Sequence, residues 1–111
     1  KINELDLKSS IEISELSKFV SESKSGTETR ISEKGSNISG GQKQRIGIAR
    51  TIYKKPEVLI FDEAFNSLDK KTCIKILENI KKRYSSKTIF IISHDLSLKD
   101  HCSQIIDLDN L

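Results

Sequence analysis

Apolar residues recur at helical spacing in two regions of the chain. Near the N-terminus they predict two short helices, the second with Ser14 as its candidate N-cap; the supporting positions are Leu5, Leu7, Ile11 and Ile13, then Leu16, Phe19 and Val20. Residues 21–35 are polar and contain two glycines, so a loop is predicted there. A third helix is predicted to begin after Ser39, a good N-cap, and to end before Pro56.

The second half of the chain alternates between short apolar runs and a helical pattern. Val58–Phe61 and Thr88–Ile92 are typical of strands covered on both faces, and a third strand is predicted at residues 104–108. Asp69 can cap an intervening helix that continues to about Tyr84. The predicted buried face of that helix is Ile74, Leu77, Ile80 and Tyr84. This alternation favours an α/β fold, a mostly parallel sheet of about three strands with helices packed on it.

Composition excludes some classes of function and leaves the predicted fold unchanged. At 111 residues and 35% apolar residues, the chain is expected to form one small domain with a modest core. Its net charge of +3 is too small, and its lysines too scattered, to indicate nucleic acid as a partner. Cys73 and Cys102 lie in no metal or redox pattern, which indicates reduced cytosolic thiols. No apolar run approaches the ~20 residues of a membrane span.

The start of the third helix is a candidate anion site. The run Ile38-Ser39-Gly40-Gly41-Gln42 stands where a loop becomes a helix. Backbone N–H groups and the helix dipole favour an anion at such a terminus, and glycines let a phosphate approach closely. A simple N-cap followed by a permissive Gly-Gly turn is the alternative explanation.

Asp62 and Glu63 form a second candidate site. They follow the apolar run 58–61 directly, at the carboxyl end of the predicted strand, where ligands bind in open α/β sheets. One carboxylate there can hold Mg²⁺, and another can orient or deprotonate an attacking water. An exposed Asp-Glu pair that merely begins a loop is the alternative.

Taken in this order and at this spacing, the two sites resemble the signature motif and the Walker B motif of ATP-binding cassette (ABC) proteins. The first continues as Lys43-Gln44-Arg45-Ile46, and the second as Ala64-Phe65-Asn66-Ser67-Leu68-Asp69. The family commonly has Ala-Thr-Ser-Ala-Leu-Asp in the latter place, so Phe65 and Asn66 are departures, while Asp69 matches the D-loop aspartate. His94 follows the second strand, where the family carries its switch histidine.

The resemblance implies a role for each matching residue. Glu63 would be the general base, His94 the sensor of the γ-phosphate and Asp62 the metal-site residue. The residues expected to contact nucleotide are Ser39, Gly40, Gly41, Gln42 and Asp69. The cofactors implied are ATP and Mg²⁺. The partner implied is a second nucleotide-binding domain, whose site the signature residues would complete.

The resemblance covers only the later part of such a domain, because the chain contains no Gly-x-x-x-x-Gly-Lys-Ser/Thr phosphate loop. Residues 1–53 would form part of the helical subdomain with the signature helix. Residues 54–111 would form the core portion, within a partial P-loop NTPase fold. Glu33-x-Gly35, just ahead of the signature, resembles the corresponding loop of exporters. The expected protein is an ABC exporter at the cytoplasmic face of the cell membrane, with its transmembrane domain fused upstream.

Two other classes share parts of this pattern. The C-terminal ATPase lobe of a chromosome-structure or DNA-repair ATPase has similar motifs, but usually a glutamate at the position of Gln42 and a long coiled coil before it. A non-catalytic adaptor would not need the intact residues Asp62, Glu63 and His94.

By itself the 111-residue chain is expected to be inactive, because it lacks the loop that cradles the phosphates. It is also expected to self-associate through an uncovered apolar edge of its sheet.

Overall fold

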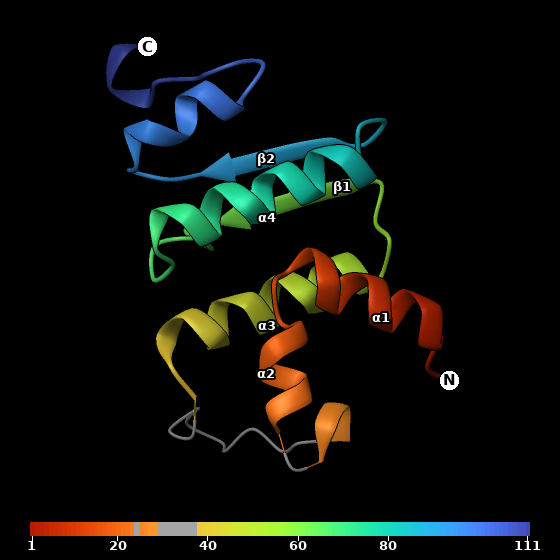
Figure 1. The fold of residues 1–111 in the computed structure, drawn as a ribbon. Helices are drawn as coiled ribbons and strands as arrows, with labels where there is room; N and C mark the ends of the chain where they lie inside the picture. Colours follow the sequence, from red (N-terminus) through yellow and green to blue (C-terminus); the bar gives the residue numbers. More distant parts are fainter. Residues whose placement is uncertain (24, 29–37) are drawn as a thin grey trace.

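The computed structural model describes residues 1–23, 25–28 and 38–111, and it places a group of helices beside a small parallel sheet (Figure 1). The α-helices and strands are α1 (Glu4–Ile13), α2 (Ser17–Glu22), α3 (Gly40–Tyr53), β1 (Val58–Asp62), α4 (Lys70–Arg83) and β2 (Thr88–Ile92). Three short 3₁₀ helices complete the list: η1 (Gly26–Glu28), η2 (Leu96–His101) and η3 (Leu108–Asn110). The Glu33-x-Gly35 motif lies outside the described residues.

Both N-terminal helices are confirmed, but the junction between them differs from the prediction. Ser14 is the C-cap of α1, not the N-cap of α2. The backbone N–H of Leu16 reaches back to the carbonyl of Ile11 at 3.0 Å, and Glu15 has a positive φ of 58°. This is a Schellman ending, which satisfies the last carbonyls of α1. It also turns Leu16 into the interior, where only 3% of it is exposed, so burial of this leucine favours the turn.

Helix α3 begins and ends as predicted, and α1 lies beside it (Figure 1). Two polar contacts join the start of α1 to the end of α3. Asn3 donates its backbone N–H to the Tyr53 hydroxyl at 2.9 Å, and Lys55 Nζ lies 2.6 Å from Asp6 Oδ1. The hydrogen bond that Lys55 donates to Asp6, together with the negative charge of Asp6, raises the pKa of Lys55. These contacts fix the helical group, which consists of α1, α2 and α3, next to the segment that leads into β1.

The sheet contains two parallel strands in the described part of the chain, with Val58 opposite Thr88 and Asp62 opposite Ile92. One face packs into the apolar core, which comprises Ile13, Ile48, Ile52, Leu59, Phe61, Phe65, Cys73, Ile76, Leu77, Ile80 and Leu98. The expectation that both faces would be covered is wrong for this chain. Residues Val58, Ile60, Phe90 and Ile92 of the other face are 47–60% exposed, because α4 covers only one side of the strands (Figure 1).

The third strand predicted at residues 104–108 is not formed. This part of the chain is irregular up to η3, and Ile105 and Ile106 are 51% and 66% exposed. A strand requires a neighbouring ladder for its backbone groups. Here the polar groups bond locally instead: Asp107 Oδ1 accepts the backbone N–H of Asp109 at 3.0 Å and so begins η3. In the described part of the chain, residues 104–107 belong to no ladder, although their apolar pattern is that of a strand.

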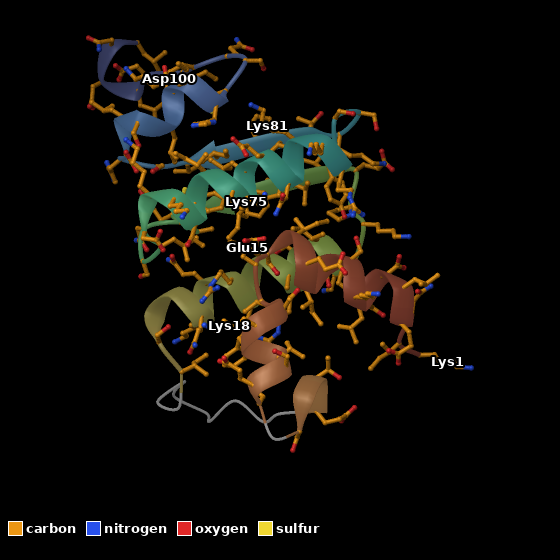
Figure 2. The ribbon with its side chains drawn as sticks, in the orientation of Figure 1. Lys1, Glu15, Lys18, Lys75, Lys81 and Asp100 are labelled. Atoms are coloured by element: carbon orange, nitrogen blue, oxygen red, sulfur yellow. The ribbon has the colours of Figure 1, made fainter. Side chains whose placement is uncertain are left out.

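Helix α4 is confirmed with Asp69 as its N-cap, but its buried stripe is shifted from the predicted one. The buried residues are Cys73, Ile76, Leu77 and Ile80, whereas Ile74 is only half-buried. Asn79 on the same helix donates to the Ile13 carbonyl at 3.1 Å and lies 3.4 Å from Glu15 Oε2. Figure 2 shows Glu15 between the helical group and α4. These hydrogen bonds set α4 against the end of α1.

Two sequence expectations concern cysteines and membrane spans. Cys73 and Cys102 are free thiols, and burial raises the pKa of Cys73. Among the helices in the described ranges, none has the length and apolar character that crossing a membrane requires.

Candidate functional site

The first part of the site is the N-terminus of α3. Ser39 Oγ accepts the backbone N–H of Gln42 at 3.0 Å, and Gln42 Oε1 accepts the backbone N–H of Ser39 at 2.9 Å. This reciprocal arrangement is a capping box, which explains why the helix begins where the sequence predicts. The Gln42 side chain therefore serves the cap in this structure.

The glycines of this terminus lie against the loop that joins β1 to α4. A Cβ atom on Gly41 would stand 3.2 Å from the Ser67 carbonyl oxygen and 3.6 Å from the Leu68 side chain. A Cβ on Gly40 would stand 3.4 Å from Ser67 Oγ. Close approach between helix and loop is thus one physical reason for glycine here, independent of any bound phosphate. Figure 1 shows the start of α3 and this loop on the same side of the molecule.

The second part of the site lies at the carboxyl ends of the two strands. Glu63 directly follows β1, and its backbone N–H donates to the carbonyl of Ile92, the last residue of β2, at 2.9 Å. Its φ is 51°, a left-handed conformation that is uncommon for residues other than glycine and that clusters at functional sites. The structure brings the two catalytic candidates together, because His94 Nε2 lies 3.4 Å from Glu63 Oε1. The imidazole is 99% exposed and the Glu63 side chain 33% exposed, so both can be reached from solvent.

The loop after β2 is fixed by local hydrogen bonds. Ser93 Oγ accepts the backbone N–H of Asp95 at 3.0 Å, and Asp95 Oδ1 accepts the backbone N–H of Ser97 at 2.9 Å. The Ser97 hydroxyl also donates to Asp95, and these hydrogen bonds lower the pKa of that carboxyl group. Because it lies between Ser93 and Asp95, His94 is held by a defined turn.

The two remaining aspartates are placed differently. Asp62, the last residue of β1, is exposed, and no side-chain hydrogen bond or ion pair engages its carboxylate within residues 1–23, 25–28 and 38–111. Asp69 caps α4: it accepts the Thr72 hydroxyl at 2.6 Å and the Thr72 backbone N–H at 3.0 Å. Those two hydrogen bonds lower the pKa of Asp69. Asp69 therefore has a structural role in this chain, while Asp62 is open to a ligand.

Sequence reasoning gave no role to Gln44 and Arg45. Gln44 makes three hydrogen bonds to the loop after β1, and Arg45 Nη1 donates to the Glu15 carbonyl at 2.6 Å. Arg45 thus connects α3 to the left-handed turn after α1. A signal was present for Gln44, since it lies on the same helical face as Gly41 and the buried residue Ile48. A polar side chain on a face that contacts other elements needs a polar partner.

The departures at Phe65 and Asn66 also find partners. Phe65 is 6% exposed, and its ring centroid lies 5.4 Å from that of Phe61, so it belongs to the core. Asn66 Oδ1 accepts from Gln44 Nε2. Both changes from the common family pattern therefore stabilise the loop that carries Glu63.

Comparison with known proteins decides the family. The family model described as "ABC transporter" matches residues 3–66, more than half of the chain. The chain belongs to the ABC transporter family. That match contains the signature residues Ser39–Gln42 together with Asp62 and Glu63, so the resemblance seen in the sequence is confirmed.

Individual relatives of this ABC protein are of the exporter type. It is 46% identical over 85 residues to a probable multidrug resistance ABC transporter ATP-binding/permease protein, YheI, of Bacillus subtilis; this covers 77% of the chain and 14% of the relative. It is 41% identical over 92 residues to the alpha-hemolysin translocation ATP-binding protein HlyB of Escherichia coli O157:H7 (83% and 13%). A putative export ATP-binding/permease protein of Rickettsia felis matches over 104 residues at 38% identity (94% and 18%).

A solved structure supports the fold. The structure of a bacterial Atm1-family ABC exporter with ATP bound superposes with a TM-score of 0.80 at 35% identity, over 86% of this chain and 17% of that one. The partial ABC ATPase fold predicted from the sequence is therefore confirmed, with a parallel sheet of two strands among the described residues in place of the three expected. The chain corresponds to part of the ATP-binding domain of exporter-type relatives and spans 13–18% of the length of those curated proteins.

Proposed function

We propose that this chain is part of an ATP-hydrolysing domain whose turnover drives export across a membrane. The observation that carries the proposal is the 3.4 Å approach of His94 Nε2 to Glu63 Oε1 at the ends of neighbouring parallel strands. A carboxylate that accepts a proton from water needs a fixed position near the phosphate that is attacked. The hydrogen bond from the Glu63 backbone to Ile92 supplies such a fixed position.

In this proposal each residue acts at a stated atom. Glu63 accepts the proton of the attacking water on a carboxylate oxygen, and His94 donates a hydrogen bond from Nε2 to the γ-phosphate. The exposed carboxylate of Asp62 has the oxygen chemistry that Mg²⁺ prefers and would hold that ion, through water in most such sites. When bound, Mg²⁺ neutralises charge on the phosphates.

The same proposal gives a role to the N-terminus of α3 and names two partner domains. The residues Ser39, Gly40, Gly41 and Gln42 present a helix N-terminus, which favours phosphate, and would complete the site of a second nucleotide-binding domain. Asp69 would lie at that interface and would also cap α4. Residues 1–53 would belong to the helical subdomain and residues 54–111 to the core. A transmembrane domain fused upstream would place the protein at the cytoplasmic face of the membrane, by analogy with the ATP-binding/permease relatives.

The alternative of a chromosome-structure or DNA-repair ATPase is not favoured, because the curated relatives named above are exporters or translocators. The decisive test is the Glu63→Gln variant in the full-length protein. It retains shape and a hydrogen-bonding group but removes the base, so turnover should fall by about 10²–10⁴-fold while ATP binding persists.

The control is Glu78→Gln, the same change at an exposed glutamate on α4. This control should hydrolyse ATP at the wild-type rate. Hydrolysis by Glu63→Gln at the rate of Glu78→Gln would remove Glu63 from the role of base and with it the proposed mechanism.

A further inference from the structure

Gln44 occupies a position from which one side chain can hold the whole loop that carries Glu63. Its Nε2 donates to the Glu63 carbonyl at 3.2 Å and to Asn66 Oδ1 at 2.5 Å, and its Oε1 accepts the Ser67 backbone N–H at 2.8 Å. A primary amide has two donor hydrogens and one acceptor oxygen. Every part of this amide is therefore used on residues 63–67. Because the Ser67 N–H can only donate, it also fixes which way the amide points.

The loop needs such a partner because Glu63 is in the left-handed region, with φ of 51°. A residue held in a sparsely populated conformation keeps it only when its surroundings determine it. On one side the Glu63 N–H bonds to Ile92 of β2; on the other side the Glu63 carbonyl bonds to Gln44 of α3. Both peptide groups of Glu63 are thus anchored, and they fix the backbone from which its carboxylate comes within 3.4 Å of His94 Nε2.

The second anchor comes from the signature helix itself. Gln44 lies one turn after Gly41, and both face the loop: Gly41 through its close approach to Ser67, and Gln44 through the hydrogen bond that it accepts from the Ser67 N–H. The Gln44 side chain is therefore a direct connection between α3 and the Glu63 carbonyl. In addition, Asn66, a departure from the common family sequence, supplies one of the three bonds in this chain.

We infer that Gln44 is a positioning residue for hydrolysis, which couples the signature helix to the catalytic carboxylate of Glu63 through the Glu63 carbonyl, Asn66 and the Ser67 N–H. The inference rests on the proposed function. It assigns Gln44 no contact with nucleotide: its amide is fully engaged with the loop, and its effect on the reaction passes through Glu63.

The test uses the full-length protein and two variants. Gln44→Leu removes all three hydrogen bonds at similar size, and Gln44→Glu keeps the shape and the acceptor for Ser67 but loses both donated bonds. Misplacing the base should lower kcat for Mg-ATP about 10- to 100-fold. KM should stay within about twofold, because ground-state binding is untouched. Values of kcat are referred to the number of sites that bind ATP, so a loss of folded protein does not count as a loss of rate.

The matched control is Gln104→Glu, the same chemical change at an exposed glutamine after η2, which should keep the wild-type kcat. A double variant, Gln44→Leu with Asn66→Leu, should be little slower than Gln44→Leu alone, since both changes break the same bond. If Gln44→Leu fails to fold, the result for Gln44→Glu decides. Wild-type kcat per binding site in the folded Gln44 variants, or simple additivity with Asn66→Leu, overturns the positioning role.

The same preparations separate this inference from the proposed function. Wild-type protein that hydrolyses ATP, together with an inactive Glu63→Gln variant, supports the proposed function whatever Gln44 does. If Glu63→Gln hydrolyses ATP like the wild type, the proposed function fails and the positioning role fails with it.

Discussion

The close approach of Gly41 to Ser67 allows a comparison of two glycines in one helix. Gly47 has no atom within 4 Å of a Cβ built on it, whereas a Cβ on Gly41 would meet the Ser67 carbonyl oxygen at 3.2 Å. Replacing glycine by alanine in an open helical position removes the entropic cost of glycine. Gly47→Ala is therefore expected to raise the free energy of unfolding by about 0.5–1 kcal/mol.

At Gly41 the same substitution gains at most that amount and must displace the loop by a few tenths of an ångström. Overpacking of this kind costs about 1–3 kcal/mol. We therefore expect Gly41→Ala to be about 1–3 kcal/mol less stable than Gly47→Ala. For a domain of about 150–250 residues, each kcal/mol corresponds to roughly 2–4 °C in the melting temperature. Because the Ser67 N–H is bonded to Gln44, displacement of the loop should also slow hydrolysis in Gly41→Ala but not in Gly47→Ala.

The assay is calorimetric unfolding and steady-state ATP hydrolysis of the complete nucleotide-binding domain with each substitution. A third variant, Gly41→Asp, adds a carboxylate at the proposed phosphate site. It should lose more activity than Gly41→Ala at similar stability, through repulsion of the γ-phosphate. Gly41→Ala that is as stable as Gly47→Ala and as active as the wild type would refute the reasoning from close approach.

Three further predictions concern the core, the cap of α4 and the isolated chain. Ile76 is fully buried, so Ile76→Ala should lower the free energy of unfolding of the domain in urea by about 2–5 kcal/mol. Ile74→Ala, at a half-buried position, should lower it clearly less. Equal losses would contradict the buried stripe of α4. The pKa of Asp69 is lowered in the folded state, so its contribution to stability is present above the unfolded pKa and is lost as pH falls below about 4. Unfolding measured across pH 2–7 should show this loss in the wild type and a smaller one in Asp69→Asn, and equal pH profiles would contradict the assignment. The 111-residue chain alone should show no tight Mg-ATP binding by titration calorimetry, because it lacks the phosphate loop. It should self-associate in light scattering, because one face of its sheet is apolar and exposed. A monomer that binds Mg-ATP with micromolar affinity would contradict both expectations.

The sequence by itself determined the elements whose cause is local. Helix α3 begins after Ser39 because Ser39 and Gln42 form a capping box three residues apart, and α4 begins after Asp69 because Asp69 bonds to Thr72. Both β1 and β2 were also predictable, since each contains a short apolar run that is followed directly by a polar residue, Asp62 or Ser93. The order of the motifs was enough to identify the ABC family, which the comparisons confirm. The same order singles out Glu63 and His94, whose side chains lie 3.4 Å apart in the structure.

Tertiary structure decided everything that depends on which residues meet across the chain. Ser14 closes α1 because Leu16 has a buried site to enter. The apolar residues Ile105 and Ile106 stay outside the sheet of the described residues, which their sequence pattern alone does not reveal. The face of α4 that is buried depends on where α1 and the sheet lie against it. The helix face of Gln44 indicated that its amide needs a polar partner, but the sequence could not identify that partner. The partners lie about twenty residues away, and an amide has no preferred partner until folding brings carbonyl and N–H groups to it.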